Sequence, residues 1–337
     1  MFSNKKGCRW ACYEWKLGKI LYMENELLRI GILVDKGTDI VEFLYKPVDI
    51  DFMWRSPFPL YRQGFPETIH GKLGKFIDYY PGGWQECFPN AGRPCEYKGA
   101  DIGLHGEVAT LPWEFEILEN SIKLLKIKFW VRTLRTPFYL EKILTLKSNS
   151  PELEIQEKVV NEAAEDMDFL WGHHPAFGEP FLDGNCIINI KNGAKVEVLP
   201  GDGISLTDLK QGIGIWPRVE GINGKIVDLS RVPGPEAKVS DVIFLSELKE
   251  GKYEIINPEL SLGFRFEFPV DVFKYIWFWR VACGSFGYPW YGRTYNIALE
   301  PFSGKAILAD AVKNGYQLTL APGKSLNVTL LVTVFRI

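Results

Sequence analysis

The chain lacks any long apolar run. None of its segments approaches the roughly 18 consecutive apolar residues that a membrane-spanning helix needs. Residues 1–20 contain Lys5 and Lys6 but no apolar stretch that resembles the core of a secretory signal. These absences argue against transmembrane helices and against export. We therefore expect a cytoplasmic protein without a membrane partner.

Positive charge and cysteine are also scarce. The 337 residues carry 39 Lys and Arg against 42 Asp and Glu, a formal net charge of -3, and no Lys/Arg-rich run occurs. A nucleic-acid partner is not expected, because such proteins display a basic patch or stripe. The six cysteines include no Cys-x-x-Cys pair, so neither a disulfide scaffold nor a zinc site is expected.

Aromatic residues, glycine and proline, in contrast, are plentiful. Aromatic residues make up 14% of the chain, and 32 Gly and 21 Pro punctuate it at short intervals, which favours strands and turns over long helices. In one strand-like run Leu153, Ile155 and Glu157 fall on one face, as in a half-buried strand. The strand-like runs are Leu27–Val34, Ile122–Val131, Leu153–Val160, Asp168–Gly172, Cys186–Ile190, Val242–Leu245, Ser261–Phe268 and Leu326–Phe335.

The sequence predicts neither long helices nor a domain boundary. No apolar stripe with a 3.6-residue period is sustained over three turns, and only short stretches such as Pro235–Ser240 and Ala306–Val312 suit a helix. No Gly/Ser-rich or Pro-rich linker and no internal repeat interrupts the chain. We expect a single all-β domain over residues 1–337, built as a large antiparallel β sandwich whose concave face would hold a sugar.

Histidine occurs only four times, at His70, His105, His173 and His174, so each local setting is informative. His105 lies in the sequence Gly-Leu-His-Gly-Glu, where the glycines allow a tight turn that presents the imidazole. His173 and His174 follow an apolar strand and precede Pro175, which holds His174 extended at a strand end. The alternative for each histidine is an ordinary hydrogen-bonded residue of the surface or core.

Glu300 ends a short apolar strand, immediately before Pro301. A lone glutamate in that position is usually solvated. Packed against tryptophan, it would lose its water, and its pKa would rise toward the range that suits a general base. Trp277, Trp279 and Trp290 lie upstream and offer apolar ring faces of the kind that stack on a pyranose, with core filling as the alternative.

Three segments resemble the signature regions of the aldose 1-epimerase, or galactose mutarotase-like, superfamily. They are Gly83–Glu116, Leu170–Gly178 and Asn296–Gly304, in the family's order and spacing. The opening segment, Asn25–Lys46, is similar to the family's first hairpin, so the resemblance covers nearly the whole chain. It implies a large β supersandwich, in agreement with the strand pattern. It also implies an enzyme that interconverts the α and β anomers of a free aldose.

The resemblance implies roles for individual residues. His105 matches the family's first histidine, in its His-Gly motif, which helps to bind and polarise the sugar. His174 matches the second histidine, the general acid at the ring oxygen, because Phe177 follows it at the family's distance. Glu300 matches the general base. The residues expected to bind the substrate are Asn90, Arg93, Asp241 and Trp279.

Anomerisation requires a proton to leave the anomeric hydroxyl while another reaches the ring oxygen. Glu300 as a carboxylate would take the first proton, and His174 as an imidazolium would supply the second. No cofactor or metal is expected, because the reaction involves neither a redox change nor a carbanion. We expect His105, His174 and Glu300 to converge within about 10 Å of one point. At least one of the three upstream tryptophans should line the same cleft.

The identity of the sugar stays open because the chain departs from the family pattern. Asn90 and Arg93 are separated where the family has Asn-Arg together, and Pro-Ala follows His174 in place of a polar-aromatic pair. A hexose-phosphate 1-epimerase of the same superfamily is therefore an alternative. It would need two or more cations near the far end of the sugar, with Arg93, Arg280 and Arg293 as candidates.

Two further alternatives come from other functional classes. A glycoside hydrolase would need a second carboxylate about 5–10 Å from Glu300, with Glu86 or Glu107 as candidates. A non-catalytic carbohydrate-binding protein would show the same aromatic residues. It would have no use for a histidine that faces a carboxylate across the anomeric centre. The sequence does not indicate an oligomeric state.

Overall fold

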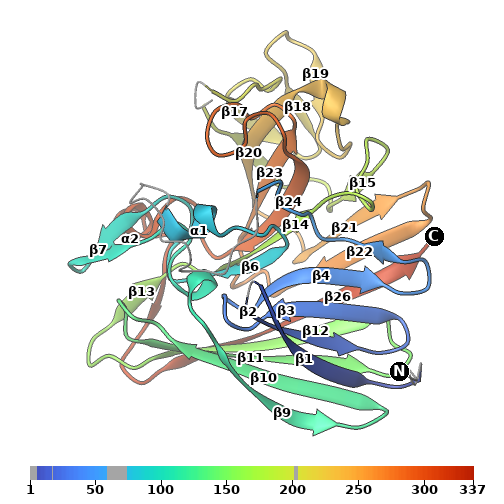
Figure 1. Cartoon of the computed structure of the whole chain (residues 1–337). Helices are drawn as coiled ribbons and strands as arrows, with labels where there is room; N and C mark the ends of the chain where they lie inside the picture. The colour runs from blue at the N-terminus through green and yellow to red at the C-terminus, as the bar shows by residue number, and fades with distance from the viewer. Residues whose placement is uncertain (1–5, 17, 59–73, 201–203) are drawn as a thin grey trace.

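The computed structural model describes residues 6–16, 18–58, 74–200 and 204–337, and it consists almost entirely of antiparallel β-strands (Figure 1). Most strands belong to two large sheets, which confirms the predicted all-β class. Among the described residues, no helix is long and apolar enough to cross a membrane.

The larger sheet draws its strands from nearly the whole chain. In spatial order it contains β1 (Arg9–Trp15), β2 (Gly18–Glu24), β3 (Leu28–Leu33), β4 (Asp39–Tyr45), β6 (Trp84–Cys87), β14 (Gly172–Phe177), β24 (Tyr295–Phe302), β23 (Tyr275–Ala282), β20 (Val239–Ser246), β16 (Lys195–Val198), β17 (Gly212–Ile215), β18 (Arg218–Glu220) and β19 (Ile226–Asp228), with β5 (Ile50–Asp51) paired to β4. Its central strands, β6, β14, β24 and β23, are therefore neighbours in space although they lie far apart in the sequence.

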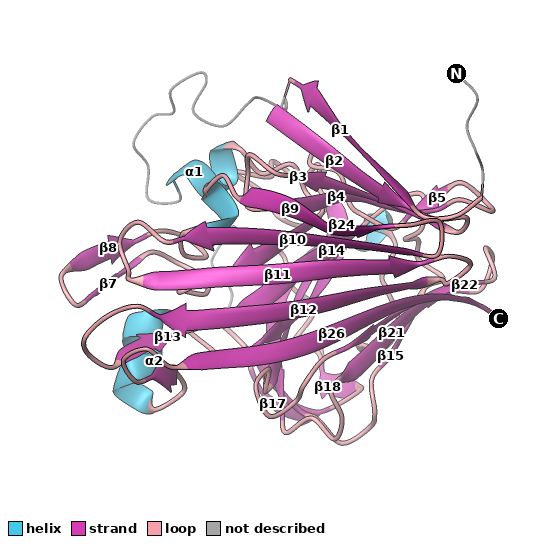
Figure 2. Cartoon of the chain, turned by 90° about the horizontal axis from the view of Figure 1, so that it is seen from below, coloured by secondary structure: helices cyan, strands magenta, loops and turns pink. Residues whose placement is uncertain are grey.

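The second sheet forms a layer of long strands that Figure 2 shows lying side by side. In spatial order it contains β15 (Ile187–Asn189), β21 (Lys252–Asn257), β22 (Leu262–Glu267), β26 (Ser325–Arg336), β12 (Glu152–Asn161), β11 (Phe138–Lys147), β10 (Leu124–Arg132) and β9 (Glu114–Asn120). The other elements are short: β7 (Cys95–Tyr97), β8 (Ala100–Ile102), β13 (Met167–Phe169), β25 (Leu318–Leu320), α1 (Gly74–Asp78), α2 (Leu308–Asn314) and two 3-10 turns, Val108–Thr110 and Pro235–Ala237.

Seven of the eight predicted strands match β3, β10, β12, β15, β20, β22 and β26. The eighth, Asp168–Gly172, is only partly confirmed because β13 ends at Phe169. Beyond that point the backbone leaves the ladder. The Leu170 N–H donates to the carbonyl of Pro89 at 2.7 Å, and the Trp171 N–H donates to the hydroxyl of Ser303 at 2.9 Å.

The two predicted helical stretches have different outcomes. Ala306–Val312 overlaps α2, which begins at Leu308. Pro235–Ser240 forms only a 3-10 turn that ends at Ala237, because β20 begins at Val239. A single turn is all that the segment can hold before the strand starts.

The two sheets pack face to face through aromatic and aliphatic side chains. In β22 the predicted alternation is confirmed, since Phe264 and Phe266 are fully buried and Arg265 between them is half-buried. The ring of Phe264 lies 5.3 Å from that of Phe43 and 4.9 Å from that of Phe177, both in the larger sheet. Each such phenylalanine stabilises the fold by about 1.5–3 kcal/mol on burial.

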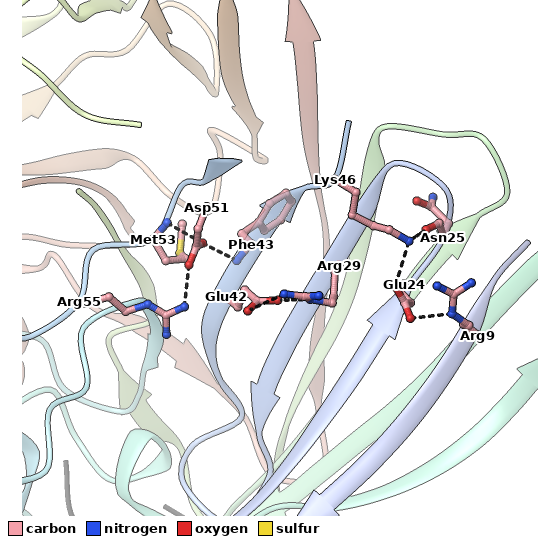
Figure 3. A network of polar contacts seen from close by, with 10 residues as sticks. All are labelled: Arg9, Glu24, Asn25, Arg29, Glu42, Phe43, Lys46, Asp51, Met53 and Arg55. Atoms are coloured by element: carbon pink, nitrogen blue, oxygen red, sulfur yellow. Dashed lines mark hydrogen bonds and ion pairs between the residues drawn. The ribbon is translucent and has the colours of Figure 1, made fainter. Parts of the chain in front are cut away.

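Ion pairs decorate the first strands of the larger sheet (Figure 3). Because these side chains are partly exposed, each pair contributes only about 0–1 kcal/mol. Arg9–Glu24 joins β1 to β2, and Arg29–Glu42 joins β3 to β4. The pairs are Arg9–Glu24, Lys46–Glu24, Arg29–Glu42 and Arg55–Asp51.

A polar network is buried between the sheets. Glu157, which was predicted to share the apolar face of its strand, lies there, with Oε2 3.1 Å from Nε2 of His173. The indole N–H of Trp84 donates to Nδ1 of His173 at 3.3 Å. Lys142 Nζ lies 2.7 Å from Oε2 of Glu86 and 3.9 Å from Oε1 of Glu157. The network therefore ties β11 and β12 of the second sheet to β6 and β14 of the larger one.

Replacing Lys142 with Ala should leave Glu86 and Glu157 buried without their cation and lower the free energy of unfolding by about 3–5 kcal/mol. The control is Lys128→Ala, because the Lys128–Glu141 pair of the second sheet is partly exposed. That change should cost no more than about 1 kcal/mol. Urea denaturation followed by tryptophan fluorescence measures both, and equal losses would contradict the role given to the network.

Candidate active site

The floor of the candidate site is a row of side chains at the centre of the larger sheet. The register pairs His174 of β14 with Gln85 of β6, and Glu300 of β24 with Trp277 of β23. Between β14 and β24, Gly172 pairs with Phe302 and Ala176 pairs with Ala298, so His174 lies opposite Glu300. Directly opposite residues of neighbouring strands project from the same face of a sheet. Four strands therefore present these four side chains on one face.

Strand alternation separates the two adjacent histidines. His173 faces the second sheet, where it contacts Glu157. His174 projects from the other face, where Nε2 lies 3.5 Å from Oε1 of Glu300. Consecutive residues of a strand point in opposite directions, so only His174 shares a site with Glu300. This geometry agrees with the choice of His174 made from the sequence.

His105, His174 and Glu300 meet on this face, as predicted. The ring centres of His105 and His174 lie 5.4 Å apart, beside the 3.5 Å contact between His174 and Glu300. His174 is 6% exposed and Glu300 is 3% exposed, so water has little access to the pair. The arrangement supplies two imidazoles and one carboxyl group within reach of a single small molecule.

A tight turn presents His105, as its glycine neighbours predicted. His105 has a φ of 56° and Gly106 a φ of 86°. A Cβ at Gly106 would lie 2.1 Å from the carbonyl oxygen of Phe88, so only glycine fits there. The N–H of Gly92 donates to Nδ1 of His105 at 3.2 Å. A backbone N–H can only donate, so neutral His105 carries its proton on Nε2.

Aromatic rings surround His174. Its ring centre lies 5.9 Å from that of Tyr80 and 5.7 Å from that of Trp279. Trp290 packs against both of these neighbours, at 6.1 Å from Tyr80 and 5.4 Å from Trp279. Trp54 contacts Tyr80, Trp279 and Trp290. These apolar rings exclude water from the contact between His174 and Glu300.

A cavity of about 260 Å³ opens beside this aromatic cluster. Trp279 and Trp290 both line it, whereas His105, His174 and Glu300 are not among its lining residues. The predicted link between a tryptophan and the acid–base residues is therefore the ring contact of Trp279 with His174. Trp277 instead belongs to the floor, where its indole N–H donates to the carbonyl of Gly304 at 3.0 Å. Polar groups from Arg93, Thr207, Ser240, Asp241 and Ser285 complete the wall. Ring faces beside several hydroxyl groups suit a small polyhydroxylated ligand.

Two predicted substrate-binding residues besides Trp279 reach the cavity, Arg93 and Asp241. Arg93 is exposed, and no hydrogen bond or ion pair joins its side chain to another described residue. Asp241 is engaged by Thr207 through Oδ1 and by Arg280 through Oδ2. Arg280 also pairs with Asp208 at 2.5 Å and is nearly fully buried. Arg280 is therefore committed to two carboxylates and is not placed as a cation for a phosphate.

The prediction that Asn90 binds substrate is corrected by its hydrogen bonds. Asn90 is fully buried, and its amide nitrogen donates to the carbonyls of Arg93 at 2.9 Å and Gly103 at 3.1 Å. Its amide oxygen accepts the N–H of Leu308 at 2.7 Å. All of these hydrogen bonds are made within the protein, and they connect the loop that carries His105 with the start of α2. The role of Asn90 in the site is to position that loop.

Burial changes the pKa of each acid–base group. It lowers the pKa of His174 to about 4 and raises the pKa of Glu300 well above its usual value of 4.5. Burial, and then the neighbouring His174, hold the pKa of His105 well below 6.5. The expected imidazolium of His174 is therefore not the resting form. With the two pKa values shifted in these directions, the favoured arrangement of the pair is the uncharged one, with neutral His174 and protonated Glu300.

Several residues of the site were missed by sequence reasoning. The Tyr80 hydroxyl lies 3.4 Å from Nδ1 of His174, 94 positions along the chain. Gln85 donates to Oδ2 of Asp39 at 3.1 Å, and Lys36 Nζ lies 2.5 Å from the same oxygen. No local motif connects these residues with His174. The one available signal was the pair of tyrosines directly before Pro-Gly-Gly, which precedes β6.

The chemistry on offer comes from imidazole and carboxyl groups. In the described part of the chain, no group of three or more His, Cys, Asp or Glu residues is arranged to hold a metal ion. The six cysteines are free thiols. Cys87 lies beneath the site, where burial, followed by the charges of Glu300 and Asp39, raises its pKa well above 9. Such a thiol is a poor nucleophile.

Comparison with known proteins identifies a family and a fold. Residues 18–203 match the family described as "Domain of unknown function (DUF4432)". No curated protein matches the sequence.

Solved structures share the fold over nearly the full chain. A Klebsiella pneumoniae protein described as a "putative aldose 1-epimerase" superposes with a TM-score of 0.75 at 14% identity, covering 98% of this chain and 88% of that one. A galactose mutarotase-like protein from Clostridium acetobutylicum gives a TM-score of 0.64 at 15% identity, covering 98% and 99%. A galactose mutarotase related enzyme from Lactobacillus acidophilus gives 0.61 at 18%, covering 94% and 97%. The fold is therefore galactose mutarotase-like.

Replacing Glu300 with Gln should make stability less dependent on pH. Because its pKa is raised, folded Glu300 keeps a proton that the unfolded chain releases above about pH 4.5, so its contribution is present at low pH and is lost as pH rises toward the folded pKa. The stability of the wild type relative to the variant should therefore fall between about pH 5 and pH 8. Denaturant unfolding at both pH values measures this, with Glu267→Gln as control. A constant difference would contradict the raised pKa.

Proposed function

The chain belongs to the family described as a domain of unknown function, DUF4432, and we propose that it is an aldose 1-epimerase that interconverts the α and β anomers of a free aldose. The observation that carries the proposal is the buried contact of 3.5 Å between His174 Nε2 and Glu300 Oε1. His105 beside the pair and the tryptophan-lined cavity support it. The larger sheet takes strands from Arg9 to Phe302 and the second sheet from Glu114 to Arg336, and this overlap supports one functional unit over residues 1–337.

The proposed reaction is balanced within the pair. Glu300 takes the proton of the anomeric hydroxyl as the bond between C1 and the ring oxygen breaks, and His174 gives a proton to that oxygen. The aldehyde then rotates about the bond between C1 and C2. Closure on the other face reverses both transfers, so the pair ends with the single proton it began with. No electron leaves the sugar, and the reaction needs no cofactor.

The protonation states follow from the pKa directions. The empty pair is uncharged, with the proton on Glu300. The hydroxyl donors of a bound sugar stabilise the carboxylate, so Glu300 releases its proton. The free ring nitrogen of His174 takes one up, which creates the base and the acid together. Activity should fall below about pH 4, because His174 becomes protonated while Glu300 keeps its proton, so the pair then has no base. It should fall again above the raised pKa of Glu300, where the pair loses its proton.

His105 serves as a hydrogen-bond donor in this scheme. Because Gly92 occupies Nδ1, the Nε2–H of neutral His105 is available to a sugar oxygen. The low pKa of His105 keeps it neutral. Unlike His174, it has no contact with a carboxyl group among the described residues, so the general acid role is given to His174. Trp279 and Trp290 would stack on the apolar face of the sugar, and Asp241 with Arg93 would contact its hydroxyls.

The geometry disfavours a glycoside hydrolase. Glu86 projects from the opposite face of the sheet, where it accepts the indole N–H of Trp171 and faces Lys142. The Glu107 carboxylate accepts the backbone N–H groups of Leu134 and Arg135, both at 2.8 Å. Glu86 does not share a face with Glu300, and the Glu107 carboxylate is committed to backbone N–H groups, so neither supplies the second acid of that mechanism.

One observation keeps a phosphorylated sugar as a second candidate substrate. Arg93 lines the cavity and has no anionic partner among the described residues. Arg293 is a second exposed arginine, lying over the ring of Phe58 at 5.4 Å. A sugar phosphate would satisfy such cations, and replacing Arg93 with Ala would then weaken binding of the phosphate form more than binding of the free sugar.

Replacing Glu300 with Gln should slow anomerisation by about 10²–10⁴-fold while sugar affinity changes little, because the variant keeps shape and hydrogen bonding but removes the base. Replacing His174 with Asn should act in the same way through the acid. Polarimetry and NMR of freshly dissolved glucose, galactose, xylose and their phosphates measure the rates. Glu267→Gln serves as the control that leaves the rate unchanged.

Two outcomes would count against the proposal. Unchanged rates in both variants would mean that other residues carry the reaction. Sugar binding without acceleration by the wild-type protein on any sugar of the panel would instead indicate a non-catalytic carbohydrate-binding protein.

A further inference from the structure

Tyr80 stands behind the catalytic pair on the side opposite to Glu300. Its hydroxyl oxygen lies 3.4 Å from Nδ1 of His174, while Nε2 of the same ring faces Glu300. The ring of Tyr80 is buried, stacks on Phe76 with 5.3 Å between ring centres, and lies edge-on to Trp290. Among the described residues, His174 is the only hydrogen-bond partner of this hydroxyl.

We propose that Tyr80 is the positioning residue that makes Nε2 the reactive nitrogen of His174. Its hydroxyl donates to Nδ1 while His174 is neutral and turns to accept from the Nδ1–H group when His174 is protonated. This inference rests on the proposed function for its catalytic meaning. The arrangement of the hydrogen bond stands independently of the substrate.

The donor role follows from the burial of the phenol. A buried hydroxyl proton without an acceptor costs about 1–3 kcal/mol, and Nδ1 of His174 is the acceptor within reach. Donation to Nδ1 leaves the ring proton on Nε2. That proton points to Glu300 and to the space beside it where a sugar oxygen would lie.

The acceptor role follows from the chemistry of a hydroxyl group. A phenol carries both a proton and lone pairs, so rotation about its C–O bond lets it serve either state of the imidazole. A carboxylate in the same place would favour the charged ring strongly. Tyr80 itself stays protonated, because burial, and then the charges of Glu300 and Asp39, raise its pKa well above 10. His174 can therefore gain and lose a proton without a permanent charge behind it.

The groups that face His174 come from every side of the site. Glu300 approaches from β24, His105 from the loop after β8 and Tyr80 from the turn after α1. Asp39 of β4 lies close enough to influence Tyr80. Of these side chains, only Tyr80 contacts Nδ1. The ring also hydrogen-bonds to the backbone of His174 itself, so removal of Tyr80 measures the share of the tautomer preference that the phenol supplies.

The test is NMR of protein labelled with ¹⁵N-histidine, because protonated and unprotonated ring nitrogens have distinct shifts and the chain has only four histidines. Two of them are internal controls. Gly92 donates to Nδ1 of His105, and the Trp84 indole donates to Nδ1 of His173, so both should show the Nε2–H form. Wild-type His174 at pH 7 should show it as well. The variant His174→Asn assigns its signals.

In Tyr80→Phe, His174 should gain an Nδ1-protonated population while His105 and His173 keep their signals. The matched control is Tyr253→Phe, since Tyr253 is fully buried and its hydroxyl has no hydrogen-bond partner in the described structure. It should leave the His174 tautomer unchanged. Anomerisation by Tyr80→Phe should show a kcat lower by roughly two- to tenfold at unchanged KM.

Three results would overturn the inference: a predominantly Nδ1-protonated His174 in the wild type, an unchanged tautomer in Tyr80→Phe, or an equal response to Tyr253→Phe. The wild-type spectrum decides the question even if Tyr80→Phe does not fold. Absence of anomerisation by the wild type on every sugar would refute the proposed function, and the tautomer measurement would still decide the role of Tyr80.

Discussion

The exclusion of water from His174 and Glu300 is the constraint on which the rest of the structure depends. In water a carboxyl group ionises readily, and an imidazole near pH 7 is largely neutral. Behind the aromatic walls, charge on either group is costly, so one proton stays within the pair. Holding two such groups 3.5 Å apart without solvent requires a rigid support, which the central strands of a large sheet provide.

One strand, β14, serves both stability and the site. His173 faces inward and joins the network that ties the sheets together, whereas His174 projects from the other face, toward Glu300. Movement of β14 relative to the second sheet would disrupt the buried Glu157 and Lys142, so the position of His174 is fixed by the core. The site in turn lowers stability, because Glu300 is buried with an oxygen that has no described partner. A scaffold of this size tolerates that cost.

The sequence was sufficient to predict what depends on local patterns. Alternation in Ser261–Phe268 identified a strand with one buried face, and glycines around His105 predicted its turn. The choice of His174 over His173, made from its distance to Phe177, agrees with strand alternation. The predictions of the strand and of the turn succeeded because backbone conformation and side-chain direction follow from nearby residues.

What escaped prediction depends on contacts between distant segments. Asn90 looked available for a ligand, but Leu308, 218 positions away, occupies its amide oxygen. The protonation of His174 is set by Tyr80, Trp279 and the other rings that exclude water, and these come from separate parts of the chain. Neither effect can be predicted from the residues next to Asn90 or His174 in the sequence.

The central claim is that Glu300 holds the proton of the pair at neutral pH. Infrared difference spectroscopy of the wild type against Glu300→Gln at pH 7 tests it most directly, because a protonated carboxyl group and a carboxylate absorb at different frequencies. The account predicts the carbonyl band of a protonated carboxylic acid in the wild type, lost in the variant and shifted by ¹³C labelling of glutamate. A carboxylate signal alone would show that Glu300 is ionised and would contradict the account.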